Sequence, residues 1–289
     1  MSLGRRDGIV ARRGRSVIQP EGVSLDGNEL GRREPVEVRG CSIACLKGGA
    51  GETVLYLHGA DGAGHVLPFM SALAEHHALW VPEHPGFGQS DEPDWLDNIH
   101  DLAYFYLDFL AHLDLRDVHL VGMSLGGWIA LEIAIRSTAR IKSLTVAGAA
   151  GIHVPGLATG DVFTWSPEET LRQAFHDPAL AERAIAALPP DVEGDDTYLK
   201  NRAAFTRLAW EPRLHDPHLA KWLHRIDVPT AILWAEQDRI LEVGHARALA
   251  DLIPGARVTV LPRCGHLMHL EQPDAFVQAI ADHIRGASS

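Results

Sequence analysis

From about residue 36 onward, short runs of apolar and β-branched residues alternate with longer stretches whose apolar positions recur at helical spacing. Two early runs, at 36–38 and 42–46, have the alternating pattern of half-buried strands. Six later runs are apolar almost throughout and predict strands that are buried on both faces. These later strands are expected at 53–57, 78–82, 118–122, 142–147, 230–234 and 257–261.

Segments with helical spacing fill the intervals between most of these strands, at 65–75, 99–113, 127–136, 244–253 and 275–284. Strands that alternate with helices in this way are typical of α/β proteins. The pattern therefore predicts a mainly parallel, doubly wound sheet of about eight strands.

One interval does not fit this alternation. About 80 residues separate the strand at 142–147 from the strand at 230–234, whereas such connections typically take about 2 to 6 residues. The interval contains helical patches at 167–175, 178–188 and 197–209, separated by proline and glycine. We predict a helical cap over 150–225, inserted into an α/β core formed by 36–149 and 226–289, with a mobile tail at 1–35.

Composition narrows the classes of partner. The chain has 289 residues and a formal net charge of −12, which argues against nucleic-acid binding because phosphate contacts need clustered Lys and Arg. Residues 1–39 are the local exception, with eight Arg against six acidic residues. This stretch lacks the apolar region of a secretory signal.

Three cysteines, Cys41, Cys45 and Cys264, are too few and too widely spaced for a disulfide framework or a four-ligand zinc site. No apolar run reaches the roughly 18 residues that a membrane span requires. We therefore expect a cytoplasmic protein that has no metal and does not associate with membranes.

The residues Gly122, Ser124 and Gly126 form a G-x-S-x-G pattern. The pattern follows a predicted strand directly and opens directly into a predicted helix, which is the setting of a nucleophile elbow. Such a turn is so tight that side chains at 122 and 126 would clash. The alternative interpretation is a glycine-rich turn whose serine caps the helix.

A serine hydroxyl needs a base to take its proton. Of the 17 histidines, His266 follows the last predicted strand, at the sheet edge that also carries Ser124; His269 is the nearby alternative. Asp238 ends the preceding strand at the same edge and would orient the imidazole, with Glu236 as its rival. The order Ser, Asp, His is that of α/β-hydrolases.

A tetrahedral oxyanion needs two N–H donors. The backbone N–H of Leu125 is one candidate, because it follows the serine at the start of the helix. The second is the N–H of Ala60, in the glycine-rich loop 58–64 after the strand at 53–57. We expect His58 to serve as a structural hydrogen-bonding residue; a plain glycine-rich turn is the alternative for the loop.

Four motifs occur in order: LHGADG at 57–62, HPGFGQSD at 84–91, VGMSLGGW at 121–128, and WAEQD at 234–238 together with RCGHLMHLEQPDAF at 263–276. With these motifs the chain resembles the α/β-hydrolase superfamily, in its cap-bearing branch of esterases, cofactor-free perhydrolases and carbon–carbon bond hydrolases. The resemblance implies carbonyl chemistry without a cofactor.

The same resemblance separates subfamilies. Haloalkane dehalogenases and related epoxide hydrolases use an aspartate nucleophile, and dienelactone hydrolases use cysteine, where this chain has Ser124. Carbon–carbon bond hydrolases usually carry an Asn just before the nucleophile and a Trp just after the catalytic His, where this chain has Met123 and Leu267.

We therefore predict a serine hydrolase, monomeric or homodimeric, that acts on a small carboxylic ester or related carbonyl substrate. The cap aromatics Phe163, Trp165 and Trp210 are expected to form an apolar wall for that substrate. The alternatives are hydrolysis of a carbon–carbon bond in a diketone-type compound, acyl transfer to an alcohol or peroxide, and a non-catalytic ligand receptor on the same fold.

Overall fold

The computed structural model describes Leu30 and residues 33–288. Its centre is an eight-stranded sheet in the order β1-β2-β4-β3-β5-β6-β7-β8. The strands from β4 to β8 in this order are parallel, and β1 and β2 are antiparallel at one edge. The strands are β1 Arg33–Val38, β2 Cys41–Gly48, β3 Thr53–Leu57, β4 Ala78–Pro82, β5 Val118–Met123, β6 Ile141–Ala147, β7 Thr230–Ala235 and β8 Arg257–Leu261.

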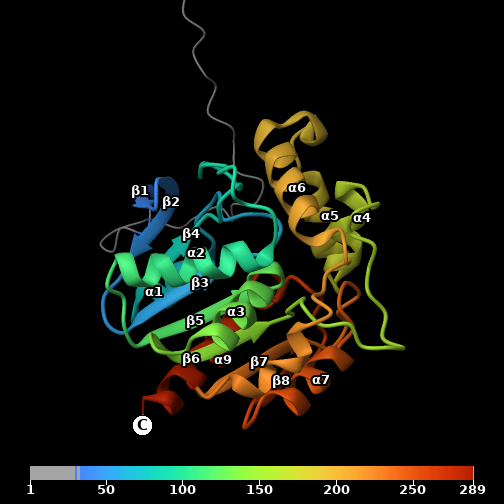
Figure 1. Ribbon diagram of the computed structural model, residues 1–289. Helices are drawn as coiled ribbons and strands as arrows, with labels where there is room; N and C mark the ends of the chain where they lie inside the picture. The colour runs from blue at the N-terminus through green and yellow to red at the C-terminus, as the bar shows by residue number, and fades with distance from the viewer. Residues whose placement is uncertain (1–29, 31–32, 289) are drawn as a thin grey trace, which may run out of the picture.

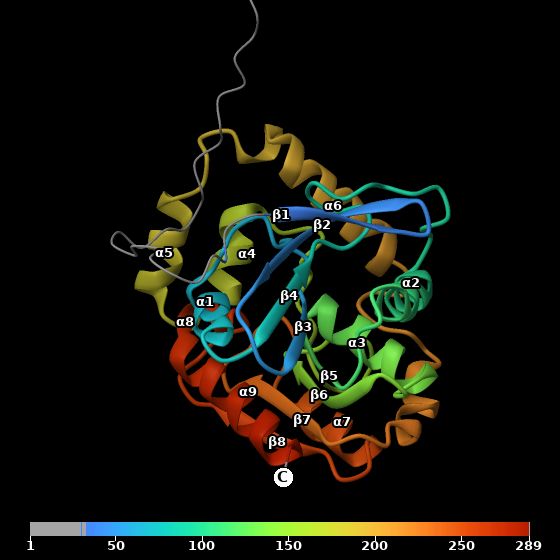
Figure 2. The same ribbon diagram turned by 90° about the vertical axis from the view of Figure 1, so that its left-hand side faces the viewer.

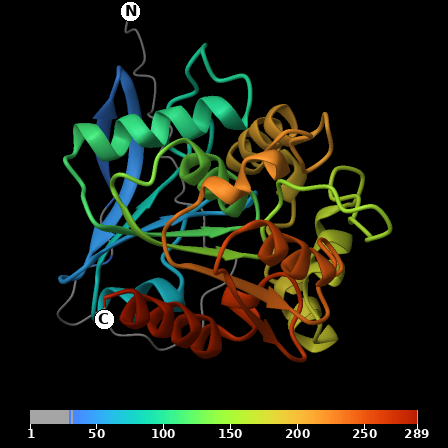
Figure 3. The same cartoon turned by 60° about the horizontal axis from the view of Figure 1, so that its bottom comes forward.

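Helices cover both faces of this sheet, as the doubly wound prediction requires (Figures 2 and 3). One face carries α2 (Ile99–His112), α3 (Leu125–Arg136) and α7 (Gly244–Leu252), and the other α1 (Pro68–Ala74) and α9 (Pro273–Ala287). Each face has its own hydrophobic cluster. None of the described helices is both long enough and apolar enough to cross a membrane.

The helix that follows Ser124, α3, is buried along nearly its whole length. Every residue from Leu125 to Ile135 is buried, because the helix lies between the sheet and α2. A helix surrounded by protein is apolar on all sides, which explains the run of Ile, Ala and Leu in this segment. This packing gives Ser124 a rigid support.

The segment between β6 and β7, which we call the inserted segment, is mostly helical. It contains α4 (Pro167–Ala174), α5 (Pro178–Ala186) and α6 (Asp196–Ala209), followed by short 3-10 turns. Each helix begins at a side-chain cap, formed by Ser166, Asp177 or Asp195, as expected for polar residues at a helix N-terminus. Figure 1 shows these helices grouped at one end of the sheet.

Two expectations differ from the structure at the sheet edges. The predicted tail at 1–35 ends too late, because β1 begins at Arg33, which pairs with Leu46 of β2; the Arg-rich run before it lies outside the described residues. Pro35 is tolerated since β1 is an edge strand. The sequence predicts a buried last strand, β8, yet Val258 and Val260 are 39% and 42% exposed, because β8 lies at the edge of the sheet and pairs, among the described strands, with β7 alone.

Candidate active site

Ser124 lies in a strained turn between β5 and α3. Its φ of 53° and ψ of −114° are unusual for a residue with a side chain. A Cβ on Gly122 would lie 2.3 Å from the carbonyl oxygen of Gly126, and one on Gly126 would lie 2.1 Å from the carbonyl oxygen of Leu57. The turn therefore requires glycine at both positions, as the sequence pattern indicated.

The structure brings the side chains of Ser124, His266 and Asp238 into one hydrogen-bonded chain. His266 Nε2 lies 3.0 Å from Ser124 Oγ, and His266 Nδ1 lies 2.7 Å from Asp238 Oδ2. A carboxylate accepts hydrogen bonds, so His266 Nδ1 carries the ring proton and donates it to Asp238. His266 Nε2 is then free to accept the serine proton. This is the geometry of a serine activated by a general base.

Two backbone groups fix the orientation of the Asp238 carboxylate. Its Oδ1 accepts hydrogen bonds from the N–H groups of Ile240 and Leu241, each at 2.9 Å. The other oxygen, Oδ2, is thereby aimed at His266. Asp238 and His266 are both buried, so solvent screens their interaction little.

The electrostatic surroundings of His266 favour its protonated form. Burial lowers the pKa of His266, but the charge and hydrogen bond of Asp238, together with the charge of Asp61, raise it more, so that the net shift is upward. An imidazolium formed by accepting the serine proton would therefore be stabilised.

The rival candidates lie in other surroundings. His269 packs edge-on against Phe69, and burial, with the charge of His266, lowers the pKa of His269 to about 3. Glu236 is exposed and its carboxylate accepts a hydrogen bond from Gln237 at 2.7 Å. Neither side chain is hydrogen-bonded into the chain that ends at Ser124.

The loop 58–64 after β3, which we call the oxyanion loop, leaves the sheet beside the turn that contains Ser124. Strand β3 pairs in parallel with β5, and Leu57 lies opposite Gly122. The chain order reverses between these two strands, and such switch points are where open α/β sheets bind ligands. A Cβ on Gly59 would lie 3.5 Å from Ser124 Cβ, so the loop passes within contact distance of the serine.

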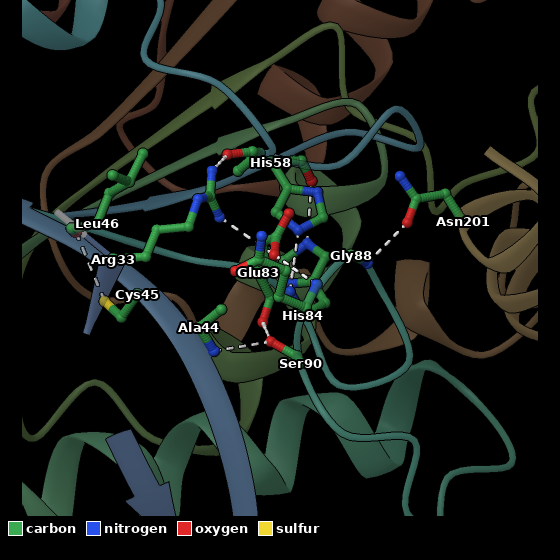
Figure 4. A network of polar contacts seen from close by, with 12 residues as sticks. Arg33, Ala44, Cys45, Leu46, His58, Glu83, His84, Gly88, Ser90 and Asn201 are labelled. Carbon is green, nitrogen blue, oxygen red and sulfur yellow. Dashed lines mark hydrogen bonds and ion pairs between the residues drawn. The ribbon is translucent and has the colours of Figure 1, made fainter. Parts of the chain in front are cut away.

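His58 fixes the orientation of the peptide group that carries the Ala60 N–H (Figure 4). The backbone N–H of His84 donates to His58 Nε2 at 2.9 Å, so the ring proton lies on Nδ1, which donates to the carbonyl of Gly59 at 2.7 Å. In a trans peptide the N–H points away from the carbonyl. Burial lowers the pKa of His58 well below its ordinary value, so the ring keeps this neutral tautomer.

Sequence reasoning missed two residues that support the site. Arg33 pairs with the buried carboxylate of Glu83 at 3.1 Å and donates to the carbonyl of Ala63 at the end of the oxyanion loop. Figure 4 shows this pair next to the two stacked histidines. Arg33 was assigned to the tail, since nothing in the sequence links it to a carboxylate 50 residues away.

The second missed residue is Glu271, whose carboxylate joins the His266 loop to the inserted segment. It accepts the N–H of Gly265 at 2.6 Å, and those of His176 and Asp177 at 3.1 and 2.7 Å. A single acidic residue near a helix end usually indicates a solvated surface, so the sequence offered no distinguishing signal.

The rings of the predicted cap aromatics contact other residues of the inserted segment. Phe163 stacks on Phe205, with ring centroids 4.8 Å apart, and meets Trp210 edge-on at 5.3 Å. Trp210 is 41% exposed and lies 4.3 Å from the guanidinium of Arg213. The Trp165 ring covers Gly160, where a Cβ would approach it to 2.4 Å.

Among the described residues, His100, Glu132 and Asp216 have metal-ligand atoms within 4.8 Å of one another. Glu132 lies eight residues along α3 from Ser124, about 12 Å at the rise of an α-helix. Its buried carboxylate already pairs with Arg136. These three residues therefore connect α2 and α3 with the segment after α6, and they lie outside the site around Ser124.

Comparison with known proteins defines the class. The sequence profile of the alpha/beta hydrolase family matches residues 54–279, which is most of the chain. The chain therefore belongs to this family, and the hydrolases among its relatives support its assignment as a hydrolase.

The chain is 29% identical over 251 residues to the dihydrolipoyllysine-residue acetyltransferase component of an acetoin cleaving system from Pseudomonas putida, covering 82% of this chain and 65% of that protein. It is 27% identical over 260 residues to a 2-hydroxy-6-oxo-6-phenylhexa-2,4-dienoate hydrolase from Burkholderia cepacia, covering 82% and 88%. An esterase structure from Exiguobacterium antarcticum shares the fold with a TM-score of 0.71, 20% identity, and coverage of 88% and 100%.

The raised pKa of His266 predicts the pH dependence of turnover. The base must be neutral to accept the Ser124 proton, so kcat/KM falls as the pH drops through the pKa of His266. We expect the midpoint of this acid limb to lie above about 6.5, the ordinary histidine value. Asp61→Asn removes one of the charges that raise the pKa, so it should move the midpoint to lower pH.

The control is Glu236→Gln, which neutralises an exposed carboxylate outside the hydrogen-bonded chain and should leave the midpoint in place. The test is a pH profile of ester hydrolysis for the three proteins. A midpoint below 6.5 in the unmodified protein, unmoved by Asp61→Asn, would show that these charges do not act on the base.

Proposed function

We propose that this protein is a serine hydrolase that acts on a small carboxylic ester or a related carbonyl substrate. The observation that carries the proposal is the hydrogen-bonded chain from Asp238 through His266 to Ser124, placed beside the loop that contains Ala60. A buried acid and a buried base that lead to a partly exposed hydroxyl constitute the machinery of acyl transfer through a covalent intermediate.

In the first half-reaction, Ser124 Oγ bonds to the carbonyl carbon while His266 Nε2 takes its proton. The carbonyl oxygen becomes an oxyanion, for which the N–H groups of Leu125 and Ala60 are the proposed donors. The intermediate collapses as the ester oxygen leaves with the proton from His266. In the second half-reaction, water attacks the acyl carbon while His266 Nε2 takes a proton from it. His266 then returns this proton to Ser124 Oγ as the carboxylic acid leaves.

The inserted segment is proposed to act as a cap over this site, as expected for 150–225. It leaves the sheet at the carboxyl end of β6, the edge at which Ser124 lies, and Glu271 fastens it to the His266 loop. A lid of this kind excludes water and contacts the part of the substrate that does not react.

A second candidate is hydrolysis of a carbon–carbon bond, which the name of the Burkholderia cepacia relative describes. The compound in that name is a dienoate and therefore carries a carboxylate. Asp61 places a negative charge close enough to act on His266. The guanidinium of Arg202, a cation that acts on Asp61, has both of its terminal nitrogens bonded to the carbonyls of Val162 and Phe163. We propose that the Asp61 carboxylate disfavours an anionic substrate relative to a neutral ester.

Removal of the nucleophile tests whether the chain is an enzyme or a ligand receptor. Ser124→Ala should lower kcat by about 10⁴- to 10⁶-fold, and His266→Ala by a similar factor, because the two groups act as one unit. The double variant should be hardly slower than either single one. A Ser124→Ala protein with a tenth of the original rate would rule out this nucleophile, and His269→Ala is the matched control for the histidine.

A panel of substrates distinguishes the two chemistries. Neutral p-nitrophenyl esters should be turned over faster than esters with a distal carboxylate, and faster than a 2-hydroxy-6-oxo-dienoate. Asp61→Asn should narrow the gap between neutral and anionic esters by about tenfold, the effect of about 1.4 kcal/mol of charge interaction near a protein surface. A dienoate preferred over every ester would instead establish the carbon–carbon bond hydrolase.

The cap proposal predicts that an aromatic side chain selects the acyl group. Phe163→Ala should change the ratio of kcat/KM for long and short acyl chains by about 1 to 3 kcal/mol. Trp210→Ala should change it less, since that ring is 41% exposed and stacks with Arg213. Equal ratios in the unmodified protein and the Phe163 variant would remove Phe163 from the substrate wall.

A further inference from the structure

We propose that Asn201, on α6 of the inserted segment, is a positioning residue for the oxyanion loop. The inference rests on the proposed function, in which the Ala60 N–H stabilises the oxyanion. It assigns to the inserted segment a part in transition-state stabilisation in addition to its role as a cap.

Asn201 connects α6 to two loops of the core. Its Nδ2 donates to the carbonyl of Asp61 at 3.1 Å, and its Oδ1 accepts the N–H of Gly88 at 2.8 Å. The side chain is buried, with 8% of the residue exposed. Figure 4 shows Asn201 directed at Gly88.

The two bonds need an amide. One partner is a carbonyl, which requires a donor, and the other is an N–H, which requires an acceptor. A carboxylate could serve Gly88 but could not donate to Asp61. Glycine at 62 leaves room for the Asn201 side chain, since a Cβ there would lie 2.7 Å from Asn201 Nδ2. The φ of Gly62, +85°, also favours glycine.

The oxyanion loop is thereby held on both sides of Ala60. On the core side, His58 Nδ1 donates to the carbonyl of Gly59 at 2.7 Å. On the side of the inserted segment, Asn201 donates to the carbonyl of Asp61. The Ala60 N–H lies between these two anchored carbonyls, so its direction depends on both. Donors in an oxyanion hole act through such preorganisation.

Lys200, the preceding residue on α6, provides a matched control. Its Nζ donates to the carbonyls of Gly88 and Ser90 at 2.9 and 2.6 Å. These bonds also dock α6 on the core, but they do not reach the loop that contains Ala60. Loss of docking and loss of loop orientation can therefore be separated.

The test compares Asn201→Asp, Asn201→Ala and Lys200→Met in the full chain, at the pH plateau of each. Asn201→Asp keeps the acceptor for Gly88 and loses the donor to Asp61. We expect kcat to fall by about 10- to 100-fold in both Asn201 variants, less than the about 10²- to 10³-fold that loss of a whole oxyanion donor costs, with little change in KM. Lys200→Met should retain the original kcat.

A tetrahedral-adduct inhibitor provides a readout that a purely structural role would not move. Affinity for a trifluoromethyl ketone, which forms an oxyanion on Ser124, should fall in parallel with kcat in the Asn201 variants. In a Ser124→Ala background, the Asn201 substitutions should leave the affinity for the uncleaved ester unchanged. The oxyanion-hole N–H groups stabilise the ground-state carbonyl less than they stabilise the oxyanion.

The outcomes separate this proposal from the proposed function. If the protein hydrolyses esters through Ser124 while Asn201→Asp keeps full kcat and ketone affinity, the positioning role is wrong and the function stands. A Lys200→Met variant as slow as the Asn201 variants would also overturn the positioning role. If the unmodified protein turns over no ester, both fail. Should Asn201→Ala fold poorly, Asn201→Asp decides, since it preserves the bond to Gly88.

Discussion

The parallel pairing of β3 with β5 is the constraint on which the geometry of the site depends. It sets Leu57 opposite Gly122, so the loop after one strand and the turn after the other leave the sheet side by side. The close approach demands glycine at 122 and 126, where a Cβ would lie 2.3 and 2.1 Å from a backbone carbonyl oxygen. Burial of α3 and of both sheet faces then makes this arrangement rigid.

Much of this arrangement could be predicted from the sequence, for a physical reason. Parallel strands covered on both faces are continuous apolar runs, and β3, β4 and β8 have the expected limits. Ser124, Asp238 and His266 were identified because each follows such a run, and the ends of neighbouring parallel strands share one edge. The burial of β8 was wrongly inferred, since composition does not reveal which strand lies at the edge of the sheet.

The polar side chains that support the site could not be predicted in this way. Asn201 lies on α6, whose other residues include several charged ones, and Glu271 ends a helix of four residues, Met268–Glu271. Neither sequence context indicates a buried hydrogen-bonding role. Their partners are backbone groups far along the chain. A backbone carbonyl or N–H has no sequence identity, so the chemistry of these contacts is evident in three dimensions alone.

The pair formed by Arg33 and Glu83 limits how far the protein can be shortened. By sequence, residue 36 is a natural starting point, because the apolar pattern begins there. A protein begun at that residue would lack Arg33 and leave the Glu83 carboxylate, whose side chain is 1% exposed, without its cation. An unpaired buried charge of this kind typically costs about 3–5 kcal/mol. A fold begun after Arg33 is therefore expected to be less stable by about this amount.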